Sequence, residues 1–137
     1  MSHFLYIHVT WSTRAALPLI DGRRAAQLDG FLRAAARWER CQVVALGLTN
    51  TQVHLLLRLH PTTHLPRLLR HLKAGSARNV NREVPPALGT PLAWASGCLV
   101  HSVSSGVVTG VSEYVRDQAT HRVAPMQAAR CMLHAAR

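Results

Sequence analysis

The chain has 137 residues, enough for one domain with its own core and too few for two ordinary domains. Its 16 Lys and Arg against 6 Asp and Glu give a formal net charge of +10. That excess favours polyanionic partners, nucleic acid first, although a compositional bias of the source genome would also produce it. The three cysteines, Cys41, Cys98 and Cys131, fit neither a disulfide framework nor standard zinc spacings.

No apolar run approaches the roughly 20 residues that cross a bilayer, and the first residues lack the regions of a signal peptide. A membrane protein is therefore not expected. With its unpaired cysteines, the chain is expected to be soluble and cytoplasmic.

The first half of the chain predicts one helix among three strands. Strands are expected at residues 3–12, 41–48 and 52–60, and the helix at 21–39. A loop that carries Arg14 follows the first strand, and Asp21 is placed to cap the helix. A turn at residues 49–51 joins the last two strands, which should form a hairpin.

The strand at residues 52–60 carries a candidate metal site. Its alternation predicts an apolar face of Val53, Leu55, Leu57 and Leu59. The opposite face carries Gln52 and His54 at i and i+2, roughly 7 Å apart at the backbone, where both can reach one ion. A strand histidine beside a glutamine is more often an ordinary surface pair, so the metal interpretation depends on the rest of the chain.

A second helix is expected after Pro61, capped by Thr62 or Thr63 and ending near Glu83. Its polar surface carries five cations, which are Arg67, Arg70, Lys73, Arg78 and Arg82. Only Glu83 opposes them, which favours phosphate contact over an ordinary solvated face. Gly75 indicates either a close backbone approach or a break in this helix.

The remaining segments complete the fold. A proline-rich connector is expected at 84–91, a strand at 94–104, a turn at 106–110 and a helix at 111–121. This order predicts an α+β, ferredoxin-like β-α-β-β-α-β fold, an antiparallel sheet with two helices on one face plus a C-terminal helix. The other face, with Gln52 and His54, should be open to a large substrate. We expect one catalytic domain over 1–123 and a helix or tail over 124–137.

The helix at residues 111–121 carries a candidate nucleophile. Tyr114 and Gln118 are four residues apart and share one face of the helix. A tyrosine hydroxyl can attack phosphorus if a metal or cation neutralises the charge on the phosphate. Gln118 could ligate that metal through its amide oxygen. Taken alone, Tyr114 would more often be a packing residue.

Five motifs in order give the chain a family resemblance. They lie at residues 6–14, 52–57, 72–78, 94–103 and 114–118. The chain resembles the single-tyrosine HUH transposases of small insertion sequences, including relatives associated with repeated extragenic palindromes. The resemblance spans nearly the whole chain.

The resemblance implies a specific function and site. Such enzymes nick and rejoin single-stranded DNA with hairpin ends, assisted by Mg²⁺ or Mn²⁺, through a 5′-phosphotyrosine intermediate that releases a 3′-hydroxyl. It implies Tyr114 as the nucleophile and His54, Gln118 and Gln52 as metal ligands. It also implies a homodimer, in which the tyrosine helix of one chain often completes the site of the other. The expected DNA contacts are Arg14, Arg67, Arg70, Lys73 and Arg78.

The chain departs from the family pattern at the metal motif. The usual Asp-His-hydrophobic-His is here Thr51-Gln52-Val53-His54, so an amide replaces the first histidine. An amide oxygen suits Mg²⁺ but should bind it more weakly, and His8 and His101 are alternative strand ligands that would compensate. The alternative function is a catalytically silent relative that only binds hairpin or single-stranded DNA. An RNA-binding module is less favoured, because the strands lack paired aromatics for base stacking.

Overall fold

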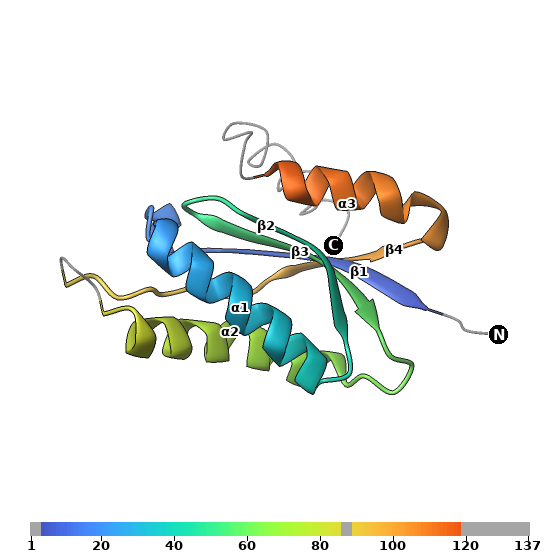
Figure 1. The fold of residues 1–137 in the computed structure, drawn as a ribbon, viewed down its shortest axis with the longest axis horizontal. Coiled ribbons are helices and arrows are strands. Elements are labelled where there is room, and N and C mark those ends of the chain that lie inside the picture. The colour runs from blue at the N-terminus through green and yellow to red at the C-terminus, as the bar shows by residue number, and fades with distance from the viewer. Residues whose placement is uncertain (1–3, 86–88, 119–137) are drawn as a thin grey trace.

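The computed structural model describes residues 4–85 and 89–118. Its elements, shown in Figure 1, are β1 (Leu5–Ser12), α1 (Gly22–Trp38), β2 (Gln42–Leu48), β3 (Gln52–Leu59), α2 (Leu65–Glu83), β4 (Leu99–Val103) and α3 (Val108–Asp117), with short 3₁₀ turns at Arg14–Ala16 and Ser105–Val107. The strands form one antiparallel sheet in the order β2-β3-β1-β4. This topology confirms the predicted ferredoxin-like fold.

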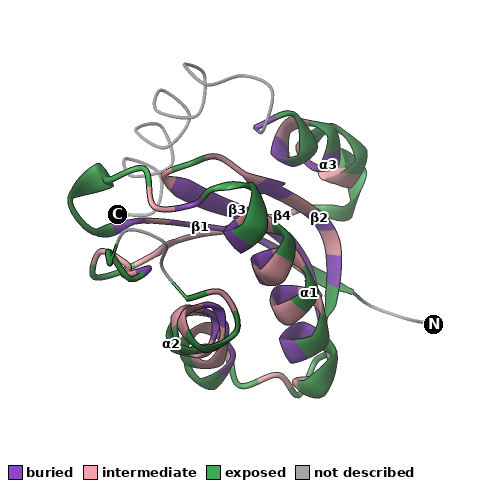
Figure 2. Cartoon of the chain, turned by 60° about the vertical axis from the view of Figure 1, so that its left-hand side comes forward, coloured by how far each residue is buried: buried purple, intermediate pink, exposed green. Residues whose placement is uncertain are grey.

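The main core lies between the sheet and the pair α1 and α2. Val53, Leu55 and Leu57 of β3 are fully buried in it, as their alternation predicted. They pack with the apolar stripes of both helices, which include Leu28, Leu32, Leu68 and Leu72. Figure 2 shows this division, with buried residues on the sheet-facing sides of α1 and α2. Within the described ranges, none of the helices is long and apolar enough to span a membrane.

The two covering helices begin at side-chain caps. Asp21 accepts a 2.8 Å hydrogen bond from the Arg24 backbone nitrogen, which confirms the predicted cap of α1. The predicted threonine cap of α2 is wrong, because His64 Nδ1 accepts from the Arg67 nitrogen at 3.2 Å. Helix α2 runs unbroken through Gly75, where an added Cβ would come within 2.9 Å of the Phe31 ring. Gly75 therefore marks a close approach of α1.

The last part of the described chain differs from the predicted boundaries. Of the strand predicted at 94–104, only Leu99–Val103 form a strand. Trp94 instead makes an isolated bridge with Thr13, and its Nε1 donates to the Lys73 carbonyl at 2.9 Å. The turn expected at 106–110 is wrong in part, since α3 begins at Val108. The predicted end of this helix and the segment 124–137 lie outside the described residues.

Helix α3 lies on the sheet face opposite α1 and α2, as Figure 1 shows. Val115 of α3 packs there against Ala45 of β2 and Leu56 of β3, in a second apolar cluster. The prediction that this face is uncovered is therefore wrong. The cause is Leu56, an apolar side chain on the otherwise polar face of β3, which α3 shields from water.

Candidate active site

Four polar side chains form a buried row across β1 and β3, beneath α3. Thr10 pairs with His54 in the strand register, and His8 precedes Thr10 by two residues on the same face. Gln52 follows the same alternation on β3. All four are buried, and His54 is 0% exposed.

Each of these side chains contacts the next one along the row. His54 Nε2 lies 3.1 Å from Gln52 Oε1, and His54 Nδ1 lies 3.2 Å from Thr10 Oγ1. Thr10 Oγ1 in turn lies 3.5 Å from His8 Nε2. We call Gln52, His54, Thr10 and His8 the buried polar chain. Because each member contacts a neighbour, their polar groups have hydrogen-bond partners, and burying them without partners would be costly.

Both histidines of the buried polar chain are neutral near pH 7. Burial, and to a smaller extent repulsion from a protonated His8, lower the pKa of His54 from 6.5 to about 3. Burial likewise lowers the pKa of His8 to about 4, with His101 as the second cause. A neutral imidazole keeps one ring nitrogen with a lone pair, which a metal ligand requires.

Gly47 lets α3 approach this row closely. Gly47 of β2 is the cross-strand partner of His54. A Cβ built on it would overlap the carbonyl oxygen of Val115 and lie 3.2 Å from the Cβ of Gln118. Since cross-strand partners share a face, Gln118 lies over the strand position next to His54.

Helix α3 brings both of its predicted site residues to this face. The Tyr114 ring packs edge-to-face on His8, with centroids 6.1 Å apart, and its hydroxyl oxygen is shielded from solvent. Gln118 is 1% exposed, and its Nε2 donates to the Tyr114 carbonyl at 2.8 Å. Its Oε1 is buried and has no hydrogen-bond partner among residues 4–85 and 89–118. Burying such an acceptor costs about 1–3 kcal/mol, so it is suited to receive a ligand.

The residues present fit a divalent cation. Neighbouring ligands on an octahedral Mg²⁺ at about 2.1 Å are roughly 3 Å apart, and the 3.1 Å between Gln52 Oε1 and His54 Nε2 matches this separation. Gln118 Oε1 offers a further oxygen. No group of three or more His, Cys, Asp or Glu in the described part of the chain is placed to hold a metal. A cation here would therefore have neutral ligands and be held weakly.

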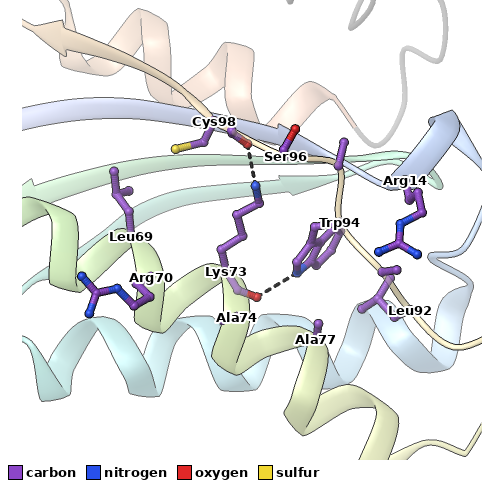
Figure 3. A pocket seen from close by; sticks show the side chains of 13 residues that line it. Arg14, Leu69, Arg70, Lys73, Ala74, Ala77, Leu92, Trp94, Ser96 and Cys98 are labelled. Carbon is purple, nitrogen blue, oxygen red and sulfur yellow. Dashed lines mark hydrogen bonds between the residues drawn. The ribbon is translucent and has the colours of Figure 1, made fainter.

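The predicted DNA contacts divide into two sets. Arg14, Arg70 and Lys73 line a groove of about 910 Å³ between α2 and residues 92–98, whose apolar lining includes Trp94. Figure 3 shows their side chains around this groove. Lys73 Nζ donates to the Gly97 carbonyl at 2.7 Å, and burial lowers the pKa of Lys73.

The other two predicted contacts do not line the groove. Arg67 is paired at 3.0 Å with Glu39, the residue that follows α1, so the prediction that only Glu83 opposes the cations of α2 is wrong. Sequence periodicity could not reveal this pair because Glu39 lies beyond the end of another helix. Arg78 is exposed on α2 outside the groove lining.

Sequence reasoning missed two residues of the site. Thr10 shares a face with His8 by simple alternation, a signal that was present but not used. Gly47 interrupts an apolar strand, and a glycine within a strand often marks a close backbone approach.

Comparison with known proteins places this geometry in context. Residues 1–118 match a family model described as "Transposase IS200 like". The crystal structure of a candidate transposase from Deinococcus radiodurans R1 is similar, with a TM-score of 0.69 and 25% identity over 87% of this chain and 94% of that one. A REP-associated tyrosine transposase bound to a REP hairpin has a TM-score of 0.61 and 12% identity, over 81% of this chain and 64% of that one. No curated protein sequence matches.

Proposed function

The chain belongs to the IS200-like transposase family, and on that premise we propose that it nicks and rejoins single-stranded DNA with hairpin ends through a covalent bond to Tyr114. The observation that carries this proposal is the position of Tyr114. Its ring packs on His8, whose own ring lies 5.9 Å from that of His54, and Tyr114 is carried on the helix that ends at Gln118. A nucleophile and a candidate ligand set thus lie within one chain.

The proposed cleavage is a phosphoryl transfer to tyrosine. The Tyr114 oxygen bonds to phosphorus, the bond to the 3′-oxygen breaks, and the proton lost by the phenol is balanced by one gained by the 3′-oxygen. The products are a 5′-phosphotyrosine and a 3′-hydroxyl, and attack by the 3′-hydroxyl of another end rejoins the DNA. A divalent cation, Mg²⁺ or Mn²⁺, held by His54, Gln52 and Gln118 would neutralise charge on the scissile phosphate.

The groove is the proposed binding surface for the DNA backbone. Arg14, Arg70 and Lys73 place three basic side chains along it, in a chain of net charge +10. The related fold bound to a REP hairpin supports a hairpin partner for this chain as well. Arg67 and Arg78 are assigned a weaker role, because Arg67 is paired with Glu39 and neither lines the groove. A homodimer remains part of the proposal on family resemblance.

One observation favours a second function. Gln52 gives the metal site an amide where the family uses a histidine, and the described site holds no carboxylate ligand. A protein with this substitution could bind hairpin or single-stranded DNA without cleaving it.

A covalent-adduct assay separates the two functions. The protein is incubated with single-stranded DNA from the flanks of its own gene and with Mg²⁺ or Mn²⁺, and adducts are resolved on a denaturing gel. An adduct that Tyr114→Phe abolishes supports the transposase and shows that Gln52 is tolerated. Binding without an adduct, converted to cleavage by Gln52→His, supports the binding-only relative. An adduct that survives Tyr114→Phe would reject Tyr114 as the nucleophile.

A further inference from the structure

One side of the groove is built from a segment with little secondary structure. Residues 92–98, which we call the groove wall, are irregular apart from the bridge between Trp94 and Thr13. Helix α2 forms the opposite side, as Figure 3 shows. Because an irregular segment is held by individual contacts instead of a continuous ladder of hydrogen bonds, the shape of the groove depends on what fixes its wall.

Asn81 of α2 holds the start of the groove wall with both ends of its amide group. Its Nδ2 donates to the Leu92 carbonyl at 2.9 Å, and its Oδ1 accepts from the Leu92 backbone nitrogen at 2.8 Å. One side chain thus binds both backbone groups of a residue, as a neighbouring strand does in an antiparallel pair. Leu92 is 2% exposed, so water could not easily replace these two bonds.

The next residue of the groove wall holds the turn that carries Arg14. The Arg14 backbone nitrogen donates to the Ala93 carbonyl at 2.9 Å. Figure 3 shows the Arg14 side chain beside this wall, where it lines the groove. Asn81 and Arg14 are therefore connected through two successive residues of the wall.

The turn after Arg14 is strained. Ala15 and Ala16 both have a φ of 54°, which lies in the left-handed region. Residues with a Cβ are disfavoured there, and such conformations persist only where the surrounding contacts fix them. We therefore expect the position of Arg14 to depend on its bond to the groove wall.

Arg24 of α1 joins the same two segments independently of Asn81. Its guanidinium is buried and donates to the Leu19 carbonyl at 2.8 Å and to the Thr90 carbonyl at 2.7 Å. Leu19 belongs to the loop that carries Arg14, and Thr90 precedes the groove wall. Loss of the Asn81 contacts should therefore shift the wall without unfolding it.

We propose that Asn81 is a positioning residue for DNA binding, which holds the groove wall in place and, through the wall, the turn that carries Arg14. Asn81 itself does not line the groove, so it acts on DNA only through the residues that it positions. The proposal rests on the role of the groove in the proposed function.

The test is a double-mutant cycle of Asn81→Ala and Arg14→Ala, measured by fluorescence anisotropy with labelled single-stranded DNA from the flanks of the gene. Arg14→Ala should raise the Kd by about 5-fold at about 0.1 M salt and lower the salt slope by about 0.7, the effect of one lost phosphate contact. Asn81→Ala should cause a loss of up to the same size. Because Asn81 acts through Arg14, the double variant should bind no more weakly than Arg14→Ala alone.

Asn79→Ala is the matched control. Asn79 lies on α2 two residues before Asn81, and its Oδ1 accepts a 2.8 Å hydrogen bond from Gln27 of α1. This variant should keep the wild-type Kd and salt slope. If Asn81→Ala does not fold, as judged by circular dichroism, Asn81→Gln takes its place in the cycle, because it keeps the amide and displaces it by one methylene.

Four outcomes would overturn the proposal. Additive losses in the double variant would show that Asn81 does not act through Arg14. Wild-type affinity in a folded Asn81→Ala variant, or an equal loss in Asn79→Ala, would remove any special role of Asn81. Wild-type binding by Arg14→Ala alone would remove the groove contact on which the proposal rests, and the Tyr114 adduct assay then judges the cleavage activity separately.

Discussion

Gly47 of β2 lies directly under the carbonyl oxygen of Val115 on α3, with no room between them for a side chain. The same glycine pairs with His54 across the sheet and lies beneath Gln118. A backbone contact without side chains thus sets the height of α3 above the candidate metal ligands. Tyr114 is carried on the same helix, so this contact also positions the proposed nucleophile.

The first prediction concerns this contact. Gly47→Ala adds a Cβ that overlaps Val115, so α3 must lift or tilt, at a cost of about 1–3 kcal/mol in the free energy of unfolding. Displacement of a reacting group by about 1 Å can lower a rate on the order of 10²-fold, and we expect a loss of this size in adduct formation by Tyr114. Urea denaturation and the rate of adduct formation measure the two effects.

Gly110→Ala is the matched control on α3 itself. A Cβ at Gly110 meets nothing within 4 Å among the described residues, and alanine is the better helix former by about 1 kcal/mol. The variant should be as stable as the wild type or more so, with unchanged adduct formation. Equal losses in Gly47→Ala and Gly110→Ala would contradict a special role for Gly47.

The sequence predicted the sheet and its two covering helices because their signals are local. The alternation of β3 and the Asp21 cap depend on neighbouring residues, and both were found as predicted. The face with Gln52 and His54 was wrongly predicted to be uncovered, because the position of α3 depends on contacts between distant segments, Gly47 with Val115 and Leu56 with the same helix. The Arg67–Glu39 ion pair was not predicted for the same reason, since its two residues lie far apart in the sequence.

The candidate site shows the same division. The i and i+2 spacing of Gln52 and His54 placed these two side chains together from the sequence alone, and the structure brings them within hydrogen-bonding distance. The buried acceptor of Gln118 and the bridging position of Thr10 could not be read from spacing, because each depends on which side chains the fold places around it.

The second prediction concerns stability in acid. The pKa values of His8 and His54 are lowered in the folded chain to about 4 and about 3, from 6.5 in the unfolded chain. The unfolded state therefore binds more protons below pH 6.5, and the stability present above that pH is lost as pH falls toward 4. Each histidine should contribute a slope of up to about 1.4 kcal/mol per pH unit.

Urea denaturation as a function of pH measures this slope. His8→Gln removes one of the two titrating groups and should roughly halve the dependence between pH 6.5 and pH 4. A replacement of the exposed His60 should leave it unchanged. An undiminished slope in His8→Gln would show that other groups cause the loss of stability in acid.

The third prediction concerns the groove. Arg70→Ala and Lys73→Ala should each weaken binding of single-stranded DNA across sequences and lower the salt dependence by about 0.7 per lost phosphate contact. Arg67→Ala should have a smaller effect, because Arg67 is paired with Glu39. Fluorescence anisotropy over a range of salt concentrations measures affinity and slope together.

Arg33→Ala is the control for net charge. Arg33 is paired with Asp29 on α1 and does not line the groove, so its loss removes one positive charge without a predicted contact. If Arg33→Ala lowers the salt slope as much as Arg70→Ala, the binding follows the overall charge of the protein, and the groove has no special part in it.

The last prediction concerns the origin of Tyr114 in each site. In the structure α3 packs on β2 and β3 of its own chain, and Tyr114 contacts His8 of the same chain. Two inactive variants, Tyr114→Phe and His54→Ala, should therefore remain inactive when they are mixed, unfolded together and refolded. In a dimer that exchanges α3, some mixed sites would combine an intact His54 with an intact Tyr114, and adduct formation would return. Recovery of adducts in the mixture, with none in either variant alone, would show that the tyrosine acts on the partner's site.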